Sequence, residues 1–80
     1  MVKRNLTADK KRVTYAFASG SLGDRDYLDA MTVLALLERL RDMGEIYRVD
    51  KIDPSSFEEI RKRLEEIVDG VLEKAESRVS

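Results

Sequence analysis

The last third of the chain carries the clearest structural signal in the sequence. From Phe57 to Val79, apolar side chains recur at steps of three and four residues. They fall within an arc of about 140° on a helix that turns by about 100° per residue, and most of the remaining positions are charged. Such a helix must bury its apolar stripe, so the sequence predicts an amphipathic helix over about residues 56–78 that forms one wall of a core.

The start of this helix is predicted by the residues around Pro54. Ser55 is expected to cap the first turn, and Glu58 follows it at the spacing of a capping box. Gly70 projects onto the polar side of the same helix, where it lowers helix stability relative to alanine. The predicted helix therefore has a marked beginning and one weak point on its exposed side.

The central segment, residues 24–43, is helical in composition and apolar in almost every direction. It follows a glycine-bearing break at residues 19–23, and Gly44 is expected just beyond its end. Leu36 lies inside the stripe that should be exposed, and apolar residues cover most other directions: Tyr27, Leu28, Ala30, Met31, Val33, Leu34, Ala35, Leu37 and Leu40. A helix that is apolar nearly all round is a buried one. We therefore expect the centre of a three-helix bundle or a part of a subunit interface.

The first element has two interpretations. As a helix over about residues 7–18, it places Val13, Ala16 and Phe17 on one side, with Thr7 as the cap. As a strand, residues 13–18 alternate and are rich in β-forming side chains, and residues 45–52 are the candidate partner strand. A two-stranded parallel sheet seldom stands alone, which favours the helix.

The predicted fold is therefore a single all-α domain over residues 1–80, a three-helix antiparallel bundle, with an α+β fold as the alternative. A chain of 80 residues supports one compact core at most. Residues 1–6 are expected to be a flexible basic segment.

The stretch from Tyr15 to Ala30 resembles the bend of helical hairpins of the tetratricopeptide-like kind. The resemblance rests on the Gly23-Asp24 turn, which precedes Tyr27 and then Ala30 on the second helix. It covers about 16 residues, and no full repeat of 34 residues follows. It implies a helical hairpin and no particular function.

Several classes of chemistry are disfavoured by composition. The chain has no Cys and no His, and therefore lacks thiolate nucleophiles, Cys-bearing zinc sites and the commonest general base. Asp24, Asp26 and Asp29 fit the start of a helix better than a metal site, because the calcium-loop spacing fails. Residues 20–23 lack the pattern of a phosphate-binding loop. We expect no enzyme activity, no metal and no cofactor.

The localisation expected from the sequence is cytoplasmic. The longest uninterrupted apolar stretch, Val33 to Leu37, is far too short for a membrane span, and the charged start does not resemble a secretory signal. Charged residues make up 39% of the chain, which is a density that fits a thermostable protein.

The first functional hypothesis is a helical protein–protein interaction module that self-associates as a homodimer. The interface would use surplus apolar surface of the central and last helices, namely Met31, Leu34, Leu36, Leu40, Ile60, Leu64, Ile67 and Val71. Apolar residues of the last helix keep a spacing that suits antiparallel helix packing, within the fold or between subunits. The alternative for these same residues is an intramolecular three-helix core.

The second hypothesis is a nucleic-acid-binding module. It would use the basic residues near the start of the chain, Lys3, Arg4, Lys10, Lys11 and Arg12. The net charge of −1 and the acids on the later helices disfavour it, because a nucleic-acid-binding domain normally has a strongly basic footprint.

Overall fold

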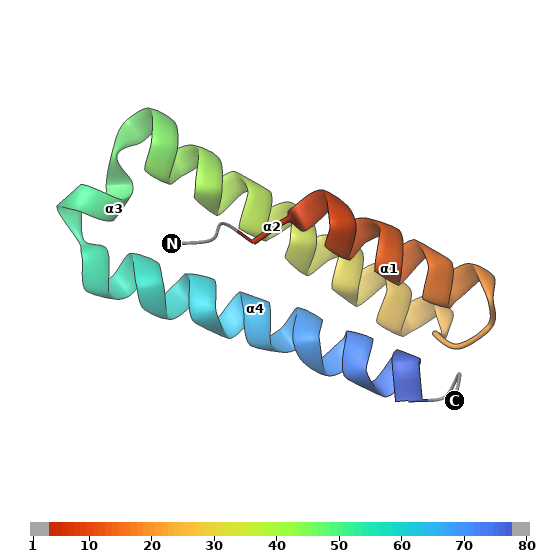
Figure 1. The fold of residues 1–80 in the computed structure, drawn as a ribbon. Coiled ribbons are helices and arrows are strands. Elements are labelled where there is room, and N and C mark those ends of the chain that lie inside the picture. The colour runs from red at the N-terminus through yellow and green to blue at the C-terminus, as the bar shows by residue number, and fades with distance from the viewer. Residues whose placement is uncertain (1–3, 78–80) are drawn as a thin grey trace.

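A computed structural model describes residues 4–77, and every regular element in that range is a helix. The elements are α1 (Leu6–Ala18), α2 (Asp24–Tyr47), α3 (Val49–Ile52) and α4 (Pro54–Ser77). Figure 1 shows α2 running antiparallel to both α1 and α4, with the short α3 forming the corner between α2 and α4. The three long helices form the bundle, so the all-α prediction is confirmed.

The α+β alternative is wrong. Residues 13–18 lie within α1, and residues 45–52 are divided between the end of α2 and α3. Neither segment has a strand to pair with, whereas a helix satisfies its backbone groups internally. The prediction also missed α3, which adds a fourth helix to the described residues.

Two helices begin at caps that lie two residues earlier than predicted. The Asn5 side chain accepts a hydrogen bond from the backbone N–H of Ala8 at 3.0 Å, so Thr7 lies inside α1. The Asp53 side chain accepts one from the backbone N–H of Ser56 at 3.2 Å. Pro54 then occupies the first helical position, where a missing N–H costs nothing, and Ser55 lies inside α4. The predicted last residue of this helix, 78, lies outside the described residues.

The central helix continues through Gly44, contrary to the prediction that it ends before this residue. It ends at Tyr47, and Arg48 follows in the left-handed conformation at φ 61° with its N–H bonded to the carbonyl of Met43. A Cβ at position 44 would lie 3.0 Å from the Phe57 ring. Gly44 therefore allows α4 to approach α2 closely and does not stop the helix.

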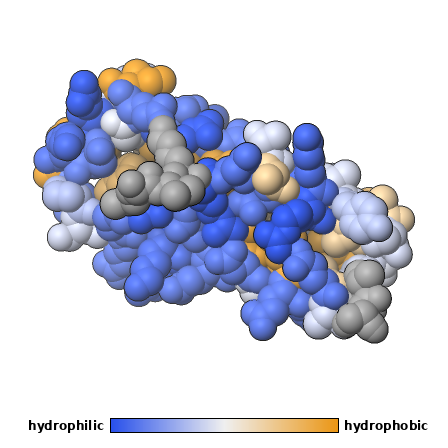
Figure 2. Space-filling model, viewed as in Figure 1, coloured by the Kyte–Doolittle hydropathy of each residue, from blue (hydrophilic) through white to orange (hydrophobic). Residues whose placement is uncertain are grey.

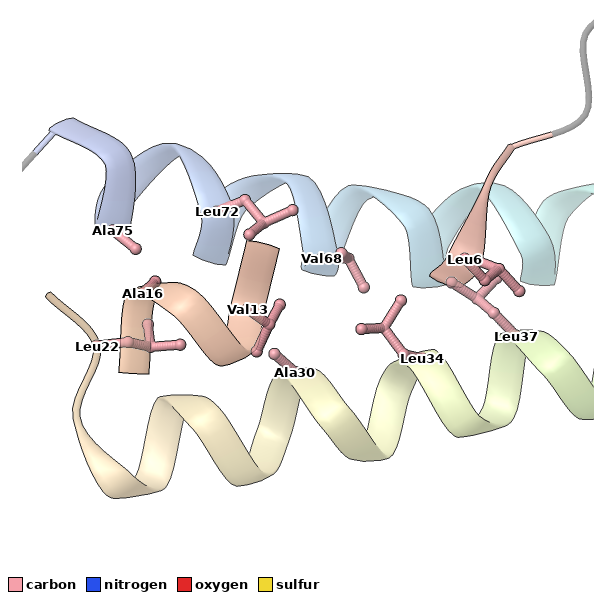
Figure 3. Packing of buried hydrophobic residues seen from close by; sticks show 10 residues of the cluster. All are labelled: Leu6, Val13, Ala16, Leu22, Ala30, Leu34, Leu37, Val68, Leu72 and Ala75. Carbon is pink, nitrogen blue, oxygen red and sulfur yellow. The ribbon is translucent and has the colours of Figure 1, made fainter. Parts of the chain in front are cut away.

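The core lies between the three long helices. Figure 3 shows its side chains meeting between the ribbons, and Leu34, Leu72, Val13 and Val68 are the largest that are fully buried. Within residues 4–77, the buried apolar residues are Leu6, Val13, Ala16, Leu22, Ala30, Leu34, Leu37, Val68, Leu72 and Ala75. One compact core thus spans the bundle.

The hairpin of α1 and α2 has the geometry that the tetratricopeptide-like resemblance implied. Residues 19–23 form the turn, in which Gly20 has a φ of 83°. Across the hairpin, the rings of Phe17 and Tyr27 stack with their centroids 4.2 Å apart.

The start of α1 makes side-chain contacts with the rest of the molecule. Leu6, its first residue, is buried in the core, and Arg4 is hydrogen-bonded to two carboxylates. Flexibility of the basic segment 1–6 stays a prediction. Residues 1–3 lie outside the described range.

Candidate interaction surfaces

The position of α1 defines two sides of the pair formed by α2 and α4. On α2, Tyr27 stacks on Phe17 and Glu38 forms an ion pair with Lys10, so these positions mark the side that faces α1. On α4, Asp69 and Glu76 mark the corresponding side through their ion pairs with Arg4 and Arg12 of the N-terminal region. The opposite side of both helices has no third helix over it within residues 4–77.

Apolar residues gather on the side of α2 and α4 that points away from α1. Because a helix turns by about 100° per residue, these residues are rotated about the helix axis by about 130° to 190° from the side that faces α1. We call this set the outer face, and it consists of Leu36, Leu40, Ile60, Leu64, Ile67 and Val71. Leu36, Ile60 and Ile67 are 47%, 50% and 48% exposed, and the others are half-buried. Three large apolar side chains of the outer face are thus strongly exposed to solvent on a single chain.

Two residues of the predicted interface do not lie on the outer face. Leu34 is fully buried in the core, and Met31 packs against the core on the side of α1. Leu64 and Val71 also pack against the core, although they lie at the edge of the outer face. For these four residues the intramolecular alternative describes contacts that the chain makes with itself.

A second group of exposed apolar residues lies at the α3 end of the molecule and was not among the predicted site residues. Ile46, Tyr47 and Ile52 are strongly exposed, and Met43 is close to half exposed. Figure 2 shows hydrophobic surface at this end, beside the corner where α2 passes into α3. Ile46, Tyr47 and Ile52 lie in residues 45–52, the segment that the sequence suggested as a partner strand, and they are divided between α2 and α3.

The predicted nucleic-acid-binding residues are mostly engaged in ion pairs within the chain. Arg4 lies 2.6 Å from both Asp9 and Asp69. Lys10 pairs with Glu38 on α2, and Arg12 with Glu76 on α4. Lys11 is exposed, and Lys3 lies outside the described residues. The basic segment therefore connects α1 to its neighbours and has little charge left for phosphate.

These ion pairs also change proton affinities. The hydrogen bond from Arg4 lowers the pKa of Asp69, and the bonds to Asp69 and Asp9 raise the pKa of Arg4. Asp9 itself is almost fully buried, at 6% exposure. The Arg4 guanidinium thus compensates a buried carboxylate and an exposed one at the same time.

The acidic residues at the start of α2 are spread along the first turns of the helix. Asp26 lies 4.0 Å from Lys74 of α4, and no group of potential ligands among residues 4–77 is arranged to hold a metal ion. Asp24 and Asp26 occupy the first turn of α2, where negative charge favours the helix dipole.

A cleft of about 600 Å³ opens at the α3 end, between α2 and α4. Leu6, Leu37, Gly44 and Phe57 contribute its apolar lining. Its charged lining residues are Arg4, Arg41, Glu45, Arg48, Asp50, Glu58, Arg61 and Glu65. The cleft was not foreseen from the sequence, because it depends on how far α1 extends along the other two helices.

A comparison with family models, with curated proteins and with solved structures finds no match to this chain. None of the helices in the described range has both the length and the apolar character that a bilayer-spanning segment needs. The functional argument therefore depends on the surfaces of the molecule itself.

Proposed function

We propose that the protein is a helical protein–protein interaction module that self-associates through the outer face and acts by binding, without catalysis. The observation that carries the proposal is the row of half-exposed residues formed by Leu36, Ile60 and Ile67. Single exposed apolar residues are common, but several of them on one side of a helix pair are typical of an association surface.

The outer face suits the centre of a dimer interface. Its residues span positions 36–40 on α2 and 60–71 on α4, so the apolar strip is about 17 Å long and, across two helices, about 20 Å wide, or about 340 Å². A stable interface of standard size buries about 800 Å² on each partner. The apolar strip would therefore supply the buried centre, and the polar residues of α2 and α4 around it the rim.

A second copy is a suitable partner for this face. A two-fold dimer places the same apolar patch on both sides of the interface, so that each strip covers the other. The net charge of −1 means that two copies do not strongly repel each other. Stacking two such pairs would bury the outer face between four long helices, as in helical bundles.

The proposal is tested by measuring the mass of the protein in solution at micromolar concentration. Sedimentation or light scattering should give twice the chain mass of 9.2 kDa. Ile67→Glu should shift the protein to the monomer. Because a two-fold dimer loses this side chain twice, at about 1.5–3 kcal/mol each, its Kd should rise more than about 100-fold.

Ile52→Glu is the matched control, because Ile52 is 78% exposed and lies on α3 outside the outer face. This variant should keep the mass of the dimer. Circular dichroism on both variants checks that the helices are intact. A wild-type protein that remains a monomer, or an Ile67→Glu protein that remains a dimer, would refute self-association through this face.

A further inference from the structure

We propose that the cleft at the α3 end binds an amphipathic helix from a partner protein. This helix would lie end to end with α1 in the groove between α2 and α4. This site lies on the side of α2 and α4 that faces α1, away from the outer face. It therefore adds a second binding function that does not depend on self-association.

The first argument is the length of α1. It has 13 residues, whereas α2 and α4 have 24 each, so a third helix covers the groove between them over little more than half of its length. The remaining part is about 16 Å long, which corresponds to about three helical turns. Figure 1 shows α1 beside the half of the bundle farther from α3. The groove already accepts one helix, and its open part has the same two walls.

The second argument is the floor of the cleft. Leu37 and Phe57 line it from α2 and α4, and Leu6 lines it at the start of α1. Gly44 presents no side chain there, and the Phe57 ring approaches it so closely that a methyl group would meet the ring at 3.0 Å. An apolar floor between two helices is the feature that binds the apolar face of a third.

The third argument is the charge of the rim. Arg41, Glu45 and Arg48 lie on the α2 side. Arg41 lies 3.8 Å from Asp42, whereas Arg48 has no ion-pair partner among residues 4–77. Glu58 and Glu65 lie on the α4 side, where both pair with Arg61. A fitting helix therefore carries an acidic residue on the edge that faces Arg48.

The fourth argument concerns the end of the cleft at α3. Asp50 lines the cleft there, and its Oδ1 is buried without a hydrogen-bond partner in the described part of the chain. A buried acceptor without a partner is costly, and the first turn of a helix has N–H groups that lack acceptors. The occupant is therefore a helix with its N-terminus towards Asp50, running parallel to α1.

The test uses a synthetic peptide of about 14 residues that is designed for this groove. It carries leucines on one face and glutamates along one edge, and a peptide of the same composition in scrambled order is the reference. Titration into labelled protein, followed by NMR, should shift the signals of Gly44, Phe57 and Asp50. The scrambled peptide should leave these signals in place.

Charge reversal locates the binding. Arg48→Glu should lower the affinity for the peptide about tenfold. A second peptide, with lysines in place of the edge glutamates, should bind this variant about as tightly as the first peptide binds the wild-type protein. Arg39→Glu is the matched control, because Arg39 is exposed on the opposite side of α2 and should not change the affinity.

Four results of the peptide titration would overturn the proposal. They are no shift at peptide concentrations up to about 1 mM, equal binding of the scrambled peptide, shifts confined to the outer face, and an Arg48→Glu protein that binds both peptides alike. Signals of the cleft that move with protein concentration alone would assign it to a second copy, and would also contradict a foreign helix.

Discussion

The Arg4 side chain is the perturbation with the clearest expected effect on stability. Its Nε lies 2.6 Å from Oδ2 of Asp9, and its Nη2 lies 2.6 Å from Oδ1 of Asp69. Asp9 is buried in α1, whereas Asp69 is exposed on α4. The substitution Arg4→Ala therefore leaves one carboxylate buried with weakened compensation and removes a direct connection between α1 and α4.

The magnitude follows from the burial of Asp9. Removing one partner of a buried ion pair costs about 3–5 kcal/mol. We expect less here, about 2–3 kcal/mol, because the Arg4 side chain is 24% exposed and Arg12 Nη1 remains 3.8 Å from the other oxygen of Asp9. A domain of 80 residues has a free energy of unfolding of about 4–12 kcal/mol. The change should therefore lower Tm by about 10–20 °C.

Urea denaturation followed by circular dichroism measures this change. Asp69→Asn is the matched control, because it removes only the exposed half of the interaction and should cost less than about 1 kcal/mol. Adding Asp9→Asn to the Arg4→Ala protein should recover part of the lost stability, since the buried charge is then gone. Equal effects of Arg4→Ala and Asp69→Asn would show that the buried pair does not stabilise the fold.

Three further measurements test individual positions. Gly70→Ala should raise the free energy of unfolding by about 0.5–1 kcal/mol in a denaturation experiment, because a methyl group there meets open space. Gly44→Ala should give no such gain, since the methyl group meets the Phe57 ring, and adding Phe57→Leu should restore the gain. Arg4 lowers the pKa of Asp69 in the folded protein, so this contribution to stability is complete above the unfolded pKa of about 3.9 and is lost as the pH falls further. Asp69→Asn should therefore flatten the acid limb of a stability–pH curve.

The long helices were predictable because their signals are local. The stripe from Phe57 onwards repeats at helical spacing, and the acidic start of α2 follows a glycine-bearing turn. The exact ends were less predictable, because neighbouring side chains compete for the same cap. Asp53 caps α4 ahead of Ser55, since Pro54 is well suited to the first helical position.

Gly44 shows why a local rule can fail. A glycine after a helical segment usually marks its end, and this prediction considered only the α2 sequence. Phe57 comes from another helix and lies against Gly44, so the reason for the glycine is a tertiary contact. The same limitation applies to the cleft, because no local pattern states how far one helix extends along two others.

Both proposed surfaces arise because α1 is shorter than α2 and α4 and covers only one side of them. The long helices α2 and α4 form a pair with apolar residues on two sides, and α1 covers one side over 13 residues only. The outer face is left without a third helix, and the cleft is the part of the covered side that α1 does not reach. A chain of this size has no further element among residues 4–77 with which to cover either surface. Association is therefore the means by which such a fold can bury the apolar surface that its own helices leave exposed.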